Sequence, residues 1–263
     1  MYVGIVQTEP IFGEVEKNLR HVQSLIGEKR SDLWVLPELF ASGYQFTTKE
    51  EVAGLAEHVP DGPITQFLAT IARRQHCHIV AGLAEHVDGQ IYNTAVLVGP
   101  SGVLSIYHKI HLFFEEKRWF APGERPPPVI DIGQARVGMM ICFDHLFPEA
   151  ARTLALNGAD IIAHPANLVI PDYAQLTMRV RALENGVFTA TANRIGTEAR
   201  GDQSLHFTGE SQIVSPRGEI IVRFSADGEE VRVIEIDPIQ ARDKSLNSYN
   251  DILSDRRPGL YMH

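Results

Sequence analysis

The chain has 263 residues, a length that suits one large α/β domain able to bury its own core. Acidic residues outnumber basic ones, 33 to 24, and the formal net charge of −9 argues against nucleic acid or an anionic membrane as a partner. No apolar run approaches the length of a membrane span, and the first residues lack the basic segment of a signal peptide. With only two cysteines, Cys77 and Cys142, we expect a cytoplasmic protein in a reducing compartment.

The first half of the chain predicts strands joined first by helices and then by hairpins. Apolar residues recur at helical spacing in two stretches, 15–26 and 64–75. Short apolar runs predict strands over residues 2–7, 33–36, 79–87, 91–98 and 103–107. Asp88-Gly89 is a typical hairpin turn between two of these strands. Residues 113–128 lack periodicity and are rich in proline, so we expect a structured loop there.

The second half opens with an apolar strand, a sharp turn and a helix over residues 137–149. Pro148 suits the first helical turn, and Asn157-Gly158 suits the end of that helix. Further strands are expected over 160–164, 186–192, 211–216, 219–224 and 230–236, and helices over 173–185 and 238–244. Because crossover helices and hairpins occur together, the pattern favours an α/β fold with two sheets face to face and helices outside.

Three predicted strands are followed by a charged or reactive side chain, namely Glu38, Lys109 and Cys142. A thiol needs a base, and Glu38 is able to accept its proton. An acyl-transfer intermediate carries negative charge on oxygen, which Lys109 and the backbone N–H of Phe143 are suited to stabilise. The place of Cys142 between a strand and a helix N-terminus also predicts a lowered thiol pKa. The alternative is an ordinary buried cysteine.

Three segments that contain these residues resemble the signature segments of the nitrilase superfamily of carbon–nitrogen hydrolases. They occur in the family's order, and stretches at 120–123, 181–185 and 255–258 extend the resemblance over essentially the whole chain. The three segments are Leu36-Pro-Glu-Leu-Phe40 with Gly43-Tyr44, Tyr107-His-Lys-Ile-His-Leu-Phe113, and Ile141-Cys-Phe-Asp-His-Leu-Phe-Pro-Glu149.

The resemblance implies a four-layer α-β-β-α sandwich that forms a single domain over residues 1–263. It implies Glu38 as general base, Lys109 as oxyanion stabiliser and Cys142 as nucleophile, with no cofactor. The family often has a second glutamate after the lysine, which Glu116 matches best, although Glu115 is adjacent. It also implies a homodimer or higher homo-oligomer, in which the tail from about residue 247 contacts a partner subunit.

The predicted substrate is a small aliphatic amide or nitrile, cleaved to a carboxylate and ammonia through a Cys142 thioester. The turn after Cys142 contains no arginine to bind a substrate carboxylate, which argues against N-carbamoyl amine and ω-amidase substrates, the alternative within the family. The residues expected to line the substrate pocket are Tyr44, Phe143, His145, His164 and Asn167.

Two other functional hypotheses remain open on the sequence alone. One is a Cys-His hydrolase that uses His145 or His164 as base. The other is a catalytically silent binding or scaffold protein with the same fold. His76-Cys-His78 has no second ligand pair nearby in the sequence, so we expect a structural role there and no metal.

Overall fold

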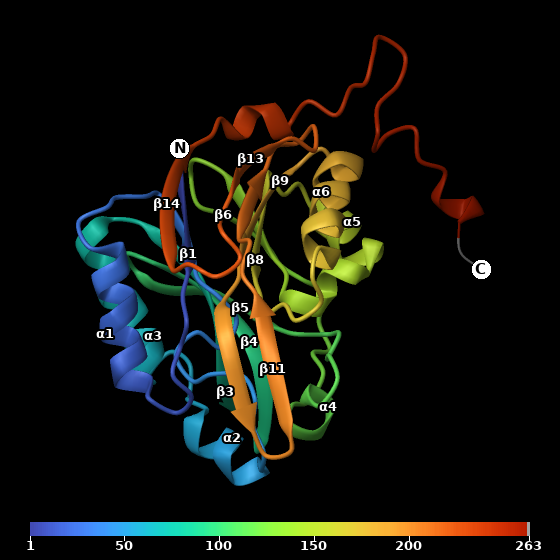
Figure 1. Ribbon diagram of the computed structural model, residues 1–263. Helices are drawn as coiled ribbons and strands as arrows, with labels where there is room; N and C mark the ends of the chain where they lie inside the picture. Colours follow the sequence, from blue (N-terminus) through green and yellow to red (C-terminus); the bar gives the residue numbers. More distant parts are fainter. Residues whose placement is uncertain (262–263) are drawn as a thin grey trace.

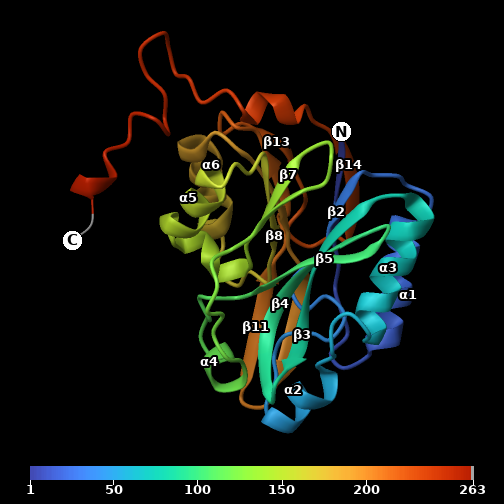
Figure 2. The ribbon, with the colours of Figure 1, turned by 180° about the vertical axis from the view of Figure 1, so that it is seen from behind.

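Two six-stranded sheets pack face to face, with helices on both outer faces (Figures 1 and 2). The computed structural model describes residues 1–261. Across the first sheet the strands are β14 (Glu230–Glu235), β1 (Tyr2–Gln7), β2 (Leu33–Val35), β3 (His78–Val87), β4 (Gln90–Gly99) and β5 (Gly102–His108). Across the second they are β13 (Ile220–Arg223), β12 (Gln212–Val214), β9 (Phe188–Ala192), β8 (Ile161–Pro165), β7 (Arg136–Met139) and β6 (Val129–Asp131).

Each sheet is covered by a pair of helices. On the first sheet lie α1 (Val15–Ile26) and α3 (Pro63–Gln75), and on the second lie α5 (Pro148–Leu156) and α6 (Tyr173–Asn185) (Figure 1). Each pair buries its apolar side chains in a cluster shared with its own sheet. The predicted α-β-β-α sandwich is therefore confirmed.

A third apolar cluster fills the space between the sheets. Ile5 and Val35 of the first sheet and Met139, Ala163 and Ala190 of the second are all fully buried in it. Strands β1, β2 and β3 run parallel, as do β7, β8 and β9, so these central strands are apolar on both faces. Because β2 and β3 pack against β8, the segments that follow β2 and β7 emerge close together.

Several elements differ from the sequence-based prediction. A separate hairpin, β10 (Ile195–Arg200) with β11 (Gln203–Thr208), was not predicted because its residues are mostly polar and only some face the core. Helix α2 (Lys49–Leu55) was also not predicted, and the expected loop contains a short helix, α4 (Glu116–Trp119). The helix expected over 238–244 is only a 3-10 turn at Pro238–Ala241.

The end of the described chain leaves the body of the molecule. After the 3-10 turn, residues up to 261 run outward beyond α5 and α6, and a last short turn is formed by Pro258–Leu260 (Figure 1). Tyr249 in this tail is 90% exposed. Over residues 1–261, no helix is both long enough and apolar enough to cross a membrane.

Candidate active site

Cys142 occupies the first position of a 3-10 turn, Cys142–Leu146, that follows β7 and leads into α5. Its φ of +40° lies in the left-handed region, which residues other than glycine rarely adopt. Two buried side chains hold the turn in this conformation. The carboxylate of Asp144 accepts the backbone N–H of Ile141 at 2.9 Å, and Nε2 of His164 donates to the carbonyl of Cys142 at 2.8 Å.

Glu38 follows β2 and is completely buried. Its Oε1 accepts two hydrogen bonds of 2.7 Å, one from the Asn93 amide and one from the Lys109 ammonium. Its Oε2 has no hydrogen-bond partner among the described residues. Gly82 of β3 permits this close packing, because a Cβ there would lie 2.5 Å from the Cα of Glu38. One carboxylate oxygen is therefore held in place while the other remains available to a proton.

Lys109, also fully buried, bridges two carboxylates. Besides Glu38, its Nζ donates to Oε1 of Glu116 at 2.7 Å. The same Oε1 accepts the Tyr44 hydroxyl at 2.7 Å. Glu115 instead pairs with Arg118 at the surface at 2.7 Å. Of the two adjacent glutamates, Glu116 is thus the one that meets the lysine.

Burial dominates the electrostatics of this cluster. Burial raises the pKa of Glu38 to about 7, against the opposing effect of the Lys109 ammonium. For Lys109, burial disfavours the charge, but Glu116 and Glu38 together outweigh it and raise the pKa. The lysine is therefore a permanent cation between two carboxyl groups, one of which titrates near neutrality.

The expectation of a lowered thiol pKa at Cys142 is wrong. Burial raises the pKa of Cys142 well above its ordinary value, and the charge of Glu38 adds to this effect while that of Lys109 opposes it. The short turn does not compensate for the loss of water around the sulfur. The resting nucleophile is therefore a thiol, and it requires a base.

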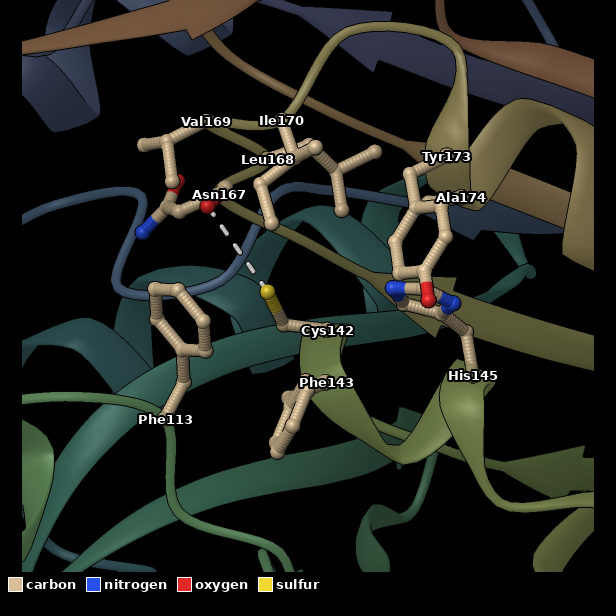
Figure 3. Close-up of a pocket in the computed structure, with 10 residues that line it drawn as sticks. All are labelled: Phe113, Cys142, Phe143, His145, Asn167, Leu168, Val169, Ile170, Tyr173 and Ala174. Atoms are coloured by element: carbon tan, nitrogen blue, oxygen red, sulfur yellow. Dashed lines mark hydrogen bonds between the residues drawn. The ribbon is translucent and has the colours of Figure 1, made fainter.

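The sulfur lies at the wall of a small cavity of about 30 Å³ (Figure 3). Figure 3 shows the sulfur directed toward the carbonyl oxygen of Asn167, 3.7 Å away. The side chain of Asn167 bonds to the backbone carbonyl of Glu38 at 2.9 Å and so ties this wall to the general-base candidate. The cavity is lined by Phe113, Cys142, Phe143, His145, Asn167, Leu168, Val169, Ile170, Tyr173 and Ala174.

Three of the five residues expected in the pocket line this cavity, namely Phe143, His145 and Asn167. The other two lie elsewhere. The ring of His164 is engaged by the carbonyl of Cys142 and by the hydroxyl of Thr191, beneath the nucleophile turn. The Tyr44 hydroxyl bonds to the Glu116 oxygen that also accepts Lys109 Nζ, and Tyr44 is not among the residues that line this cavity.

Neither histidine is placed to act as the base of Cys142. His145 Nδ1 lies 2.7 Å from the Thr177 hydroxyl, and His164 donates to a backbone carbonyl. Burial, with a smaller contribution from His164, lowers the pKa of His145 to about 3. Burial also lowers the pKa of His164 to about 4. Both rings are therefore weak bases, and the Cys142 thiol has a raised pKa, which disfavours the Cys-His alternative.

Sequence reasoning missed the residue that joins the lysine segment to the cysteine turn. Besides Ile141, Asp144 accepts the Tyr107 hydroxyl at 2.8 Å and lies 2.7 Å from Nδ1 of His111. These two partners lie two residues to either side of Lys109. Their equal spacing around Lys109 was a sequence signal that both side chains face the same partner. Only the tertiary structure shows that this partner is Asp144.

No group of three or more His, Cys, Asp or Glu side chains that is able to hold a metal ion occurs within residues 1–261. His76 ends helix α3 in the left-handed conformation, with φ +53°, and its neighbour His78 begins β3.

Comparisons with known proteins agree with this architecture. The family model described as carbon–nitrogen hydrolase matches residues 2–244. The chain is 49% identical over 262 residues to a nitrilase from Pyrococcus abyssi (strain GE5 / Orsay), covering 98% of each chain. It is 35% identical over 262 residues to an (R)-stereoselective amidase from Pseudomonas sp, covering 98% of this chain and 92% of the relative.

Among solved structures, the fold is similar to that of an amidase from Nesterenkonia sp. AN1, in a mutant form that shows covalent addition of the acetamide moiety of fluoroacetamide at the active-site cysteine. The TM-score is 0.81 at 27% identity, and the match covers 99% of this chain and 95% of that one. The chain thus belongs to the carbon–nitrogen hydrolase family, within the nitrilase superfamily. This membership confirms the predicted class of enzyme.

Proposed function

We propose that this hydrolase converts a small, uncharged aliphatic amide or nitrile to a carboxylate and ammonia through a thioester on Cys142. The observation that carries the proposal is the buried set of Glu38, Lys109 and Glu116 beside a thiol that opens onto a narrow cavity. The nitrilase and amidase relatives support the same chemistry.

The first step requires a proton acceptor for the thiol. The unpartnered Oε2 of Glu38 takes the proton from Cys142, and the resulting thiolate attacks the carbonyl carbon of the amide. With a pKa of about 7, Glu38 is ionised in a large share of molecules at neutral pH, and it binds the proton firmly enough to return it later. The proton then passes from Glu38 to the leaving nitrogen, and ammonia departs.

The tetrahedral intermediate places negative charge on the former carbonyl oxygen. Lys109 supplies a fixed ammonium held by two carboxylates, and the backbone N–H of Phe143, next to the nucleophile, supplies a second donor. Such preorganised donors act strongly in a site that excludes water. Glu38 then takes a proton from water, whose oxygen attacks the thioester, and passes that proton to the sulfur of Cys142 as the carbon–sulfur bond breaks. Glu116 and Tyr44 keep Lys109 in position throughout.

The cavity supports a small, neutral acyl group. Its lining is largely apolar, and none of its ten residues is a lysine or arginine. A substrate carboxylate would therefore lose its water without gaining a cationic partner, which is costly. His145, neutral at physiological pH, and Tyr173 are polar side chains that lie beside one another on one side of the cavity (Figure 3).

We also propose that the enzyme acts as a homodimer or higher homo-oligomer in a reducing cytoplasm. Both cysteines are free thiols, which supports that compartment. An apolar surface on α5 and α6 supports self-association with a second copy, and the outward-running tail is suited to reach it. The exposed apolar residues of that surface are Leu156, Tyr173, Leu176, Val180 and Leu183. Sedimentation at micromolar concentration tests this, and a strictly monomeric enzyme would contradict it.

An ammonia-release assay over short amides, nitriles, carbamoyl amines and ω-amides of dicarboxylic acids tests the proposed activity. A neutral short amide or nitrile should exceed any substrate with a carboxylate by about 10-fold or more in kcat/KM, which corresponds to one unpaired charge at a binding site. Cys142→Ala protein prepared in parallel serves as the blank. A preference for carbamoyl amino acids or ω-amides would overturn the substrate class.

A further inference from the structure

The β10–β11 hairpin supports Tyr44, whose hydroxyl bonds to Glu116. Figures 1 and 2 place β11 at the end of the molecule occupied by α2 and α4, and α4 begins with Glu116. The Phe207 ring of β11 packs edge-on against the Tyr44 ring, with 5.9 Å between centroids. At the tip of the hairpin, the Gln45 amide donates to the carbonyls of Arg200 and Gln203 at 3.0 and 3.1 Å.

Glu198 of β10 is the charged contact between this hairpin and the Tyr44 segment. Its Oε2 accepts the backbone N–H of Tyr44 at 3.1 Å and that of Gln45 at 2.7 Å. Its Oε1 pairs with the guanidinium of Arg194, and Glu198 and Arg194 are both buried. The carboxylate reaches these amides only because residue 43 is glycine. At its φ of +85°, a Cβ would lie 2.9 Å from Oε1.

From Tyr44 the contacts lead directly to the lysine. The Tyr44 hydroxyl donates to the Glu116 oxygen that also accepts Lys109 Nζ. Burial, reinforced by the charges of Glu116 and Glu38, raises the pKa of Tyr44, so its hydroxyl stays protonated and remains a donor. A displacement of the Tyr44 backbone would remove this donor and change how Glu116 shares its charge with Lys109.

We infer that Glu198 is a positioning residue for catalysis, which fixes the Tyr44 backbone so that the Tyr44 hydroxyl holds Glu116 against Lys109. This inference rests on the proposed role of Lys109 and deepens it. Neither Glu198 nor Tyr44 is among the residues that line the cavity beside Cys142, so we expect the loss of these contacts to lower kcat and to leave KM nearly unchanged.

The charge of Glu198 is essential to this arrangement. Its two oxygens face a guanidinium on one side and two backbone donors on the other. A glutamine has one acceptor oxygen and one donor amide, so in either orientation it points N–H groups at a donor. Glu198→Gln should therefore loosen the Tyr44 segment with little change in side-chain volume.

A double-mutant cycle of Glu198→Gln and Tyr44→Phe tests the inference by kcat, KM and thermal unfolding. Each single change should lower kcat by about 10-fold, the scale of one hydrogen bond to a charged group, with KM within about twofold. In the Tyr44→Phe enzyme, Glu198→Gln should change kcat by less than about twofold, because both changes remove the same contact. The change in unfolding temperature caused by Glu198→Gln should be the same in the parent enzyme and in the Tyr44→Phe enzyme.

Glu51→Gln is the matched control, because Glu51 pairs with Arg200 of the same hairpin but does not contact Tyr44. It should leave kcat unchanged. If Glu198→Gln fails to fold, Phe207→Leu replaces it in the cycle with the same expectation. Multiplicative losses in kcat, or a loss carried by KM, would overturn the inference. Retained turnover in Cys142→Ala would instead overturn the proposed mechanism itself.

Discussion

Cys77 and Cys142 are both free, buried thiols beside a strand, yet their surroundings differ completely. Cys77 lies between α3 and β3 in an apolar cluster, and burial raises its pKa to about 11. Burial raises the pKa of Cys142 as well. The two thiols are therefore alike in resisting ionisation. What distinguishes Cys142 is the carboxylate of Glu38 beside it, which has a pKa of about 7 and one oxygen without a hydrogen-bond partner in the described part of the chain.

The backbone makes the same distinction. The turn at Cys142 adopts a positive φ that Asp144 and His164 hold in place. Within residues 1–261 no side chain bonds to the backbone of Cys77, whose amide donates to the carbonyl of Ala72. Conformational strain at one cysteine and not the other indicates selection for the direction of the sulfur. Cys142 is therefore suited to act as a nucleophile because a base, Glu38, lies beside it and because its sulfur has a fixed direction. A lowered thiol pKa is not part of this arrangement.

The largest effect should separate the two cysteines by substitution. Cys142→Ala should lower kcat on the order of 10⁴-fold or more, because covalent catalysis is lost. Cys77→Ala should leave kcat within about twofold and lower the free energy of unfolding by about 1 kcal/mol, a typical cost for a small core truncation. Steady-state ammonia release and chemical denaturation measure both. Equal losses of activity would refute the contrast.

Removing the base should have the next largest effect. Glu38→Gln keeps the volume but removes the proton acceptor, so kcat should fall by about 10²- to 10⁴-fold, the usual contribution of general acid–base catalysis. Glu57→Gln is the matched control, a buried carboxylate that caps α3 away from the site. It should affect stability only. Near-normal turnover in Glu38→Gln would mean that another group takes the thiol proton.

A smaller effect is expected from Asp144→Asn, which alters the support of the nucleophile turn. The amide would turn a donor toward Tyr107, His111 or the Ile141 N–H, so we expect about a 10-fold lower kcat and a loss of about 1–3 kcal/mol in unfolding free energy. Asp160→Asn, at a buried aspartate that pairs with Arg242 instead, should lose stability without losing activity per folded molecule. Equal kcat losses in Asp144→Asn and Asp160→Asn would show that Asp144 has no specific part in supporting the turn at Cys142.

The sequence allowed the fold and the central residues of the site to be predicted for one physical reason. Glu38, Lys109 and Cys142 each follow a short strand rich in apolar residues, and side chains at the ends of such strands in two packed sheets are able to converge on one site. Helices α1, α3 and α6 were equally predictable, because their apolar faces repeat at helical spacing.

The remaining features depend on neighbours distant in the sequence. The thiol pKa of Cys142 depends on burial and on Glu38, which lies more than a hundred residues earlier. The choice between Glu115 and Glu116 depends on which side of a single helical turn faces Lys109. The hairpin that contains Glu198 gives no periodic signal, because most of its residues are polar and only some of them, such as Phe207, are buried.

The most direct test of the central claim is the pH dependence of iodoacetamide alkylation at Cys142, measured by mass spectrometry with Cys77 as internal reference. Because a protonated Glu38 accepts no proton, the rate at Cys142 should rise through pH of about 7 and then level. In Glu38→Gln the rise should move into the alkaline range, and Cys77 should stay slow in both proteins. A rate at Cys142 that is already maximal at pH 5, or identical profiles with and without Glu38, would contradict the account.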